Sequence, residues 1–542
     1  MRLLDLAPEL LDEIIGYCMP VGFESFALTC KGSYTYCRPQ IALHNRLSKR
    51  WKYTTNQFPR QHDTLRLLLE IVKEPLVAQY IQHLDLWDYH RSYETDVPRL
   101  IPIVNNVYDP EADFRDDEAT MLEIKDLIMH SSIPRYLALA GIDAEDWWMQ
   151  FSVPRIPSGT TSRGRNASND LPSKINQEYA FLALLFLLPN LRSLAPYYEW
   201  SDLNVYEEDS HQQHYVYPVL DALVEQSHKP HSIGQPLSNL ATILPNYTGG
   251  SQARASLGPL QWFMQLPSVT ALYGVSCLAS SNNNRYGFYF SWRYLSIPNN
   301  LTRLELAYSD IDPDNISRLL SSTRQLQSFR FHYQWKGTGI RPPWSAQLFV
   351  EAVAECCGPT ITELAVTLAV DDYIKHGVQS FLGFPKLEKL EIDLRILCGP
   401  SRESGRELVW SLAERRYRVP EGVCAWSQVE LPCLASILPK SLECVHINID
   451  GSRDGLDVMA LLSDFTEERA ALVPGLEKVL FRRWHVGLEK ELVEAEGCEF
   501  EIVEPHSNPS RSSRRRPAFW MREFEVHADG VTSNYMIVPD RF

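Results

Sequence analysis

The chain has 542 residues, of which 44% are hydrophobic and 22% charged, an ordinary composition for a folded protein. Its 68 acidic residues outnumber the 52 Lys and Arg, so the net charge is -16. An acidic chain repels phosphate backbones, which argues against nucleic acid as a general partner. The length fits two or three domains, or one quasi-linear array of repeats.

Cysteine usage and apolar runs predict the compartment. The 11 cysteines show no paired short spacing, which is typical of reduced thiols in a cytoplasmic or nuclear protein. The amino terminus is acidic, whereas a signal peptide begins with basic residues. The longest apolar run, residues 179–188, is shorter than the roughly 20 residues that a membrane helix needs, and it predicts a buried helix. We therefore expect no membrane partner.

The first predicted element is a helix near the amino terminus. Pro8 suits a first helical turn, where its missing N–H costs nothing, and Glu9 suits the positive end of the helix dipole. At 100° per residue, the apolar side chains cover an arc wider than one packing contact needs. The arc consists of Leu10, Leu11, Ile14, Ile15, Tyr17 and Cys18. We expect part of this arc to pack internally and part to remain for a partner.

Two more apolar stretches follow this helix. Gly16 and Pro20 are expected to end the first helix. The stretches at residues 23–30 and 34–43 are separated by a turn at residues 31–33. Residues 1–47 are thus predicted to form a three-helix module, a size that is marginal alone.

The segments LAPELLDEII and ALTCKGSY resemble the F-box of fungal F-box proteins. The resemblance covers about 45 of the 542 residues. The matching positions are Leu6, Pro8, Glu9, Leu10 and Leu11, then Ala27, Leu28, Cys30 and Lys31. It implies binding to a Skp-type adaptor and, through it, to the cullin scaffold of a ubiquitin ligase. The residues that it places at the adaptor interface are Leu6, Pro8, Leu10, Leu11, Ile14 and Ile15. The alternative is a plain helical cap for the rest of the chain.

A strand motif recurs in the remaining sequence: an apolar residue, two others, an apolar residue, one other and an apolar residue. Its copies begin at Ile81, Leu301, Leu326, Ile361, Leu387, Leu442 and Leu476. An apolar residue followed by proline precedes several copies, and it recurs at Leu188, Leu266, Ile297, Phe384, Leu438 and Val473. Proline is tolerated where a strand begins but not in its paired interior. Helical patterns between these strands, at residues 177–188, 217–226, 314–321, 345–356 and 374–381, predict strands that return in parallel.

This alternation resembles the repeat region of F-box and leucine-rich-repeat proteins. It implies an α/β chain in which residues 60–503 form an irregular leucine-rich-repeat solenoid, with insertions near residues 154–176, 201–214 and 399–429. No asparagine ladder follows the strands. Residues 504–517 are predicted to be a polar basic linker, whose run at 511–516 is either a nuclear-import signal or solvated chain. Residues 518–542 are predicted to form a hairpin around Asp529 and Gly530 that caps the array.

We find no pattern typical of catalysis or metal binding. The pairs His211/His214 and His228/His231 lack a partnered Glu or Cys pair, and Cys424, Cys433 and Cys444 lack zinc spacing. Asp310, Asp312 and Asp314 lack the Gly and closing Glu of a calcium loop, and predict a turn followed by a helix cap at Asp314. There is no glycine-rich phosphate loop and no nucleophile elbow. We therefore expect no catalytic residue, no cofactor and no metal.

Aromatic residues offer the best candidates for substrate contact. Tyr333 and Trp335 follow a repeat strand, and on a concave surface they would be anchors for a protein substrate; the alternative is core packing. Together the two resemblances imply a substrate-recognition subunit of a Skp-cullin-F-box-type ubiquitin ligase. One alternative is a leucine-rich-repeat scaffold outside a ligase, and another is an enzyme with an unrecognised active site.

Overall fold

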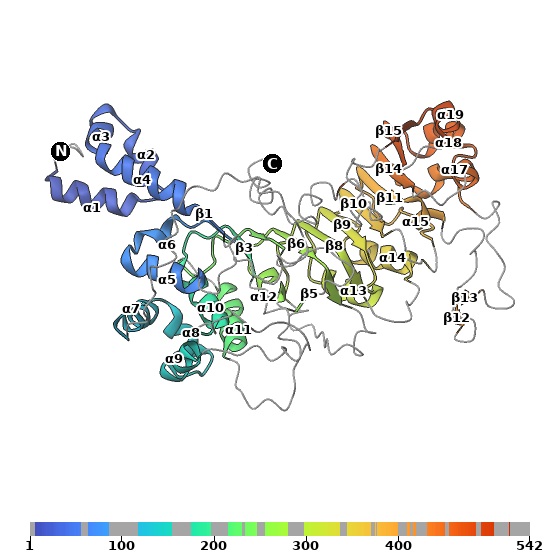
Figure 1. Cartoon of the computed structure of the whole chain (residues 1–542). Helices are drawn as coiled ribbons and strands as arrows, with labels where there is room; N and C mark the ends of the chain where they lie inside the picture. The colour runs from blue at the N-terminus through green and yellow to red at the C-terminus, as the bar shows by residue number, and fades with distance from the viewer. Residues whose placement is uncertain are drawn as a thin grey trace.

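The chain forms a mixed α/β structure with a parallel sheet, in agreement with the expected α/β class. Figure 1 shows an elongated molecule, with a group of helices at its N-terminal end and the strands following one another along its length. The computed structural model describes residues 6–55, 63–85, 118–153, 175–196, 215–229, 234–245, 255–258, 260–279, 297–336, 344–369, 374, 377–398, 409–411, 416–418, 431–449, 455–483, 489–502 and 520.

The N-terminal module contains four helices, not the three that the sequence predicts. They are α1 (Pro8–Cys18), α2 (Phe23–Ala27), α3 (Lys31–Tyr36) and α4 (Arg38–Trp51). The third predicted helix is divided because Cys37 ends α3 and Pro39 starts a new helix in its first turn, where proline needs no N–H partner. Gly16 does not end α1, which continues to Cys18.

The module is joined directly to the sheet. The last turn of α4 leads into β1 (Tyr53–Thr55), which pairs with β2 (His83–Asp85). Between them lie α5 (Asp63–Lys73) and α6 (Leu76–Tyr80). The side chain of His44 on α4 is hydrogen-bonded to the Tyr80 hydroxyl at 2.8 Å in the buried interface with α6. This hydrogen bond holds the module against α6, which directly precedes β2 in the chain.

The main sheet runs β1-β2-β3-β4-β6-β8-β9-β10-β11-β14-β15-β16, so its strands lie side by side in chain order. Every pairing along this path is parallel. After β2 the strands are β3 (Ser193–Ala195), β4 (Thr242–Ile243), β6 (Ala271–Val275), β8 (Arg303–Ile311), β9 (Ser328–Tyr333), β10 (Glu363–Leu368), β11 (Lys389–Asp393), β14 (Cys444–Ile449), β15 (Lys478–Arg483) and β16 (Glu499–Ile502). Two short strands, β5 (Ala255–Ser256) and β7 (Cys277–Ala279), pair beside β8, and β12 (Val409–Ser411) forms a separate antiparallel pair with β13 (Arg416–Arg418).

The predicted strand motif coincides with the register of this sheet. The second apolar position of each copy lies opposite the same position of its neighbour, as in Leu304↔Phe329 and Leu364↔Leu390. The full row is Leu84, Leu194, Ile243, Leu272, Leu304, Phe329, Leu364, Leu390, Val445 and Val479. All of these side chains are buried in the main apolar core. A single row of contacts therefore runs the length of the array.

Helices cover the face of the sheet that carries this row, as Figure 1 shows for α12 to α14. They are α7 (Glu118–Met129), α8 (Ile133–Leu139), α9 (Ala144–Ser152), α10 (Gln177–Leu187), α11 (Val216–Ser227), α12 (Leu260–Met264), α13 (Pro313–Leu320), α14 (Ala346–Cys357), α15 (Leu394–Cys398), α16 (Leu434–Ile437), α17 (Gly455–Leu461), α18 (Phe465–Leu472) and α19 (Glu489–Ala495). The helix expected at residues 179–188 is buried on all sides, as predicted. The cap of α13 is Asp312 and not Asp314, because its carboxylate accepts the Asn315 N–H and Pro313 takes the first turn.

A ladder of polar side chains links successive strands. Each member immediately precedes the first apolar residue of its strand motif. Its side chain donates to a main-chain carbonyl that lies ahead of the preceding strand, at 2.7–3.0 Å. The members are Asn190, Asn239, Ser268, Asn300 and Ser441. We call this set the carbonyl ladder. It satisfies carbonyls that the sheet leaves unpaired.

Several predicted features lie outside the described residues. These are most of the insertion at 154–176, the insertion at 201–214, the linker at 504–517 with its basic run, and the hairpin at 518–542 apart from Trp520. Of the insertion at 399–429, the described part is the β12–β13 pair. No helix among the described residues is long and apolar enough to cross a membrane.

Candidate functional site

The N-terminal module exposes apolar side chains. On α1, Leu11 and Ile15 are buried in the module, whereas Leu10 is 49% exposed and Tyr17 is 82% exposed. Five of the twelve large apolar side chains that are exposed in the described part of the chain lie between residues 10 and 34. These five, which we call the module patch, are Leu10, Tyr17, Val21, Leu28 and Tyr34. Isolated exposed apolar residues are ordinary, and this module carries a larger share of them than the rest of the described chain.

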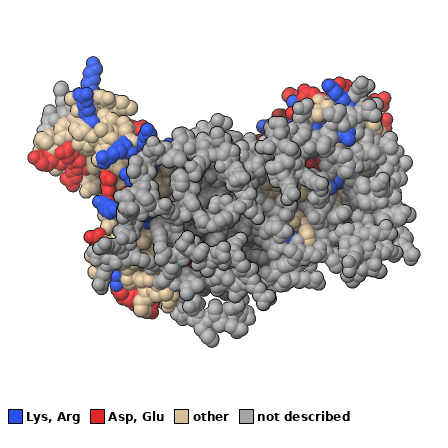
Figure 2. Space-filling model, in the orientation of Figure 1, with Lys and Arg blue, Asp and Glu red and all other residues tan. Residues whose placement is uncertain are grey.

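The six residues predicted to bind an adaptor differ in burial. Leu11 and Ile15 are buried on the core side of α1. Pro8 and Leu10 are exposed, and Leu6 and Ile14 are partly buried. Exposed acidic side chains of α1, namely Glu9, Asp12 and Glu13, lie on the same helix, and Figure 2 shows acidic side chains gathered at this end of the molecule beside uncharged surface.

The start of α1 is held by the rest of the module. The Tyr36 hydroxyl donates to the Pro8 carbonyl at 3.0 Å and lies 3.3 Å from the Asp12 carboxylate. Gln40 donates to the same carboxylate at 3.4 Å. These contacts give α1 a fixed orientation, so Leu10 and Tyr17 are presented by a rigid helix.

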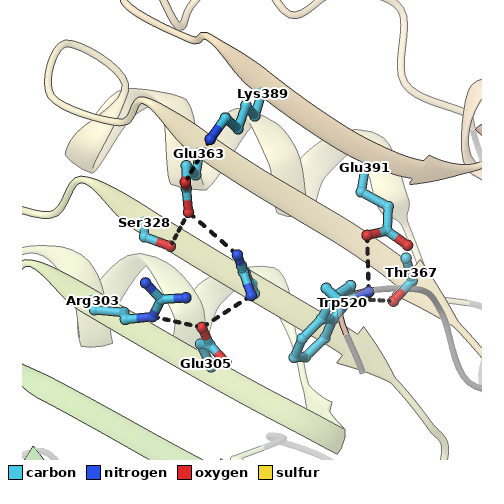
Figure 3. A network of polar contacts seen from close by, with 9 residues as sticks. Arg303, Glu305, Ser328, Glu363, Thr367, Lys389, Glu391 and Trp520 are labelled. Carbon is cyan, nitrogen blue, oxygen red and sulfur yellow. Dashed lines mark hydrogen bonds and ion pairs between the residues drawn. The ribbon is translucent and has the colours of Figure 1, made fainter. Parts of the chain in front are cut away.

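A second candidate surface is the face of the sheet opposite the helices, which we call the open face. Side chains alternate along a strand, so residues one position away from the apolar row point to this face. On β8 to β11 they form a chain of ion pairs, drawn in Figure 3. Glu305 lies 2.7 Å from Arg303 and 3.4 Å from Arg330, and Arg330 in turn lies 3.4 Å from Glu363. Lys389 follows at 3.6 Å from Glu363.

The ion pairs lower the pKa of the Glu363 carboxyl. Its burial alone would raise the pKa of the carboxyl, but Arg330, Arg303 and Lys389 outweigh burial and hold the pKa below its usual value. Ser328 also donates to this carboxylate at 3.2 Å. Each carboxylate of this chain of ion pairs is therefore flanked by two cations.

Next to the ion pairs, Trp520 lies on the open face. Its indole N–H donates to the Thr367 hydroxyl at 3.2 Å, and its main-chain N–H donates to the Glu391 carboxylate at 3.0 Å (Figure 3). These partners are 153 and 129 residues away in the sequence. Asn448 donates to the other Glu391 oxygen at 2.8 Å and so positions it. The indole is 3% exposed.

The indole belongs to an apolar cluster that extends across the open face. Trp520 belongs to a small apolar cluster separate from the main core, with Ala195, Leu244, Tyr273, Val275, Ala307, Tyr308 and Ala365. We call Thr367, Glu391 and this cluster the tryptophan seat. A bulge in β8 contributes to it: the register with β9 shifts between Leu306 and Ser309, and Tyr308 has a φ of 50°. This left-handed conformation is uncommon for a residue other than glycine.

Hydrogen bonding at the seat fixes the state of His332. The Thr367 hydroxyl lies 3.3 Å from the Phe331 carbonyl, to which it donates, so its oxygen is left to accept from Trp520 and from His332 Nδ1 at 3.0 Å. His332 is therefore neutral with its proton on Nδ1. Burial, and then the charges of Lys336 and Arg395, lower the pKa of His332 to about 3.

A buried amine lies at the edge of the same region. Lys336 is 1% exposed, and its Nζ donates to Ser276 Oγ at 3.1 Å and to Gln334 Oε1 at 2.8 Å. An amine beside a hydroxyl occurs in nucleophilic enzymes. Ser276 is 0% exposed, however, so its hydroxyl offers no path to a substrate in this conformation. Ser276 and Gln334 are thus hydrogen-bond partners of the buried Lys336 amine.

Tyr333, one of the two candidates for substrate contact, lies in the core, which is the alternative that its sequence context left open. Tyr333 stands two residues after Phe331, so it shares the core-facing side of β9, where it is 2% exposed and stacked on Trp344 at 4.6 Å between ring centres. Trp335 is partly buried against the same core. Trp520 is one of the aromatic side chains that do lie on the open face, and the repeat pattern did not single it out because it lies outside the repeats.

Among the described residues, no three His, Cys, Asp or Glu side chains are grouped to hold a metal ion. Cys444 and His446 are 3.2 Å apart on β14, and the pKa of His446 is lowered to about 4 by burial first and then by Arg482 and Lys478. His211, His214, His231 and Cys424 lie outside the described residues.

Comparison with known proteins adds no assignment. No protein-family model matches the chain, and no curated protein matches it.

Proposed function

We propose that this protein is the substrate-recognition subunit of a Skp-cullin-F-box-type ubiquitin ligase. In this proposal the N-terminal module is an F-box that binds a Skp-type adaptor, and the parallel array is an irregular leucine-rich-repeat solenoid that binds a protein substrate on its open face. The protein carries out no chemistry itself. It brings the substrate close to the ubiquitin-loading enzyme.

The observation that carries the proposal is the division of α1. Leu11 and Ile15 hold the helix to the module, while Leu10 and Tyr17 remain in solvent together with the rest of the module patch. Burying one large apolar side chain contributes about 1.5–3 kcal/mol, and association costs about 4–15 kcal/mol. Burial of the five patch residues is therefore of the size that a stable interface requires.

The connection between the two parts also supports the proposal. Because α4 runs directly into β1 and His44 is bonded to Tyr80, an adaptor bound to the module would have a fixed orientation relative to the array. A receptor that works by proximity needs this rigidity, since a fixed geometry raises the effective concentration of substrate near the loading enzyme.

The test is a pull-down of a recombinant Skp-type adaptor by the full chain. We expect wild type to retain the adaptor and Leu10→Asp with Leu28→Asp to lose it by at least about 100-fold, because two charges would be buried in an apolar interface. The matched control is Leu139→Asp with Leu122→Asp, since these leucines are 49% and 60% exposed but lie on other helices. Failure of the wild type to bind the adaptor would contradict the proposal and favour a scaffold outside a ligase.

A further inference from the structure

We propose that the tryptophan seat is a recognition site for a tryptophan residue of a partner protein, and that Trp520 is the internal competitor for it. This inference rests on the proposed use of the open face for substrate binding and specifies what that face selects. The occupant is therefore a protein segment that carries a tryptophan.

The polar contacts of the seat explain the selection. Glu391 accepts a main-chain N–H, which any non-proline residue offers, whereas Thr367 accepts the indole N–H, which Phe lacks. Both acceptors are pre-positioned, Glu391 by Asn448 and Thr367 by its contacts with Phe331 and His332. A Phe in the seat would lose the hydrogen bond from the indole N–H, and the Thr367 oxygen would keep His332 as its remaining donor.

The shape of the seat also fits one large ring. The side chains that the strands place there include Ala307 and Ala365, in a region where the neighbouring open-face positions hold long charged residues. Their small size leaves depth for an indole. Tyr308 adds an aromatic wall because the β8 bulge places it on the same side as Ala307. Strained, non-glycine backbone of this kind is found preferentially at ligand sites.

The hydrogen bonds of Trp520 are long-range: they reach strands that are 153 and 129 residues earlier in the chain. A tryptophan from another chain offers the same two N–H donors and can compete for the same acceptors. A tethered occupant acts at an effective concentration of about millimolar, so a partner must either bind through additional contacts or meet a chain whose Trp520 has left the seat.

The test measures binding of a fluorescein-labelled peptide with the sequence of residues 514–526, RRRPAFWMREFEV, to the full chain by fluorescence anisotropy. We expect Trp520→Ala to bind this peptide at least about tenfold more tightly than wild type, because the internal competitor is gone. The same peptide with Ala in place of Trp should not bind. Thr367→Val added to Trp520→Ala should weaken binding, as should Glu391→Gln, whereas the exposed control Glu477→Gln should not.

Three outcomes would overturn the inference: no binding by a folded Trp520→Ala chain, equal binding of the Trp and Ala peptides, or equal binding by wild type and Trp520→Ala. If Trp520→Ala does not fold, Trp520→Phe is tested in its place, since it keeps a ring but lacks the indole N–H. Loss of folding in both variants would show that Trp520 is a permanent part of the core, which also overturns the inference. The adaptor is absent from this assay, so its result is independent of the pull-down.

Discussion

At the scale of single residues, the titration of His332 on the open face makes the stability of the folded chain depend on pH. Its ring is buried and neutral, donates to Thr367, and has its pKa lowered to about 3 by burial and by the nearby cations Lys336 and Arg395. The unfolded chain binds a proton at a pKa of about 6.5, above the folded value. Between these two values the unfolded state holds more protons, so stability is complete above about pH 6.5 and falls as the pH is lowered.

We predict that His332→Asn will weaken this dependence. An Asn amide keeps a donor near Thr367 but cannot titrate, so the loss of stability between pH 7 and pH 5 should shrink by about 2 kcal/mol, at about 1.4 kcal/mol per pH unit below the unfolded pKa. Urea unfolding at the two pH values measures the change. His130→Asn is the control because the His130 side chain, just after α7, is 78% exposed. An unchanged pH dependence in His332→Asn would contradict the assignment of a neutral buried ring.

Tyr333 shows what residue-level inspection of the sequence missed. It was a candidate for substrate contact because it follows a strand, yet strand periodicity places it on the side of Phe329 and Phe331. Counting alternate positions along the strand would have placed Tyr333 on the core side. Trp520, in contrast, could not have been found from the sequence, because its contacts depend on strands more than a hundred residues away.

At the scale of elements, we expect replacement of two glycines by alanine to have opposite effects on stability. A Cβ at Gly358, where α14 ends, would overlap the carbonyl oxygens of Gly383 and Ala354, whereas a Cβ at Gly16 within α1 would meet nothing within 4 Å. Overpacking against backbone costs about 1–3 kcal/mol, and Gly→Ala inside a helix contributes about 0.5–1 kcal/mol. We expect Gly358→Ala to lower the unfolding midpoint and Gly16→Ala to raise it. Thermal unfolding followed by circular dichroism compares the two, and a neutral Gly358→Ala would refute the packing at the end of α14.

The strands were predicted better than their connections. The seven motif copies correspond to β2, β8, β9, β10, β11, β14 and β15, because a buried parallel strand needs apolar residues at fixed spacing. β4 was missed because Leu240 and Ile243 are followed by Pro245 where the third apolar residue would stand. The carbonyl ladder was also missed, because its members precede the motif and are Asn at some positions and Ser at others.

At the scale of the whole molecule, stability should be graded along the array. Central strands β8 to β11 have neighbours on both sides, whereas β16 has one neighbour in the described sheet and its residues are only partly buried. In a quasi-linear fold the units at the ends open most readily. Hydrogen–deuterium exchange of the full chain should therefore be slowest at β8 to β11 and fastest at β16. Uniform exchange along the sheet would instead indicate one cooperative unit.

The carbonyl ladder gives the array a direction. Every donor, from Asn190 to Ser441, reaches back to a carbonyl that occurs earlier in the chain. During synthesis the acceptors of the ladder therefore leave the ribosome before their donors. The order of translation and the order of the strands along the sheet are the same.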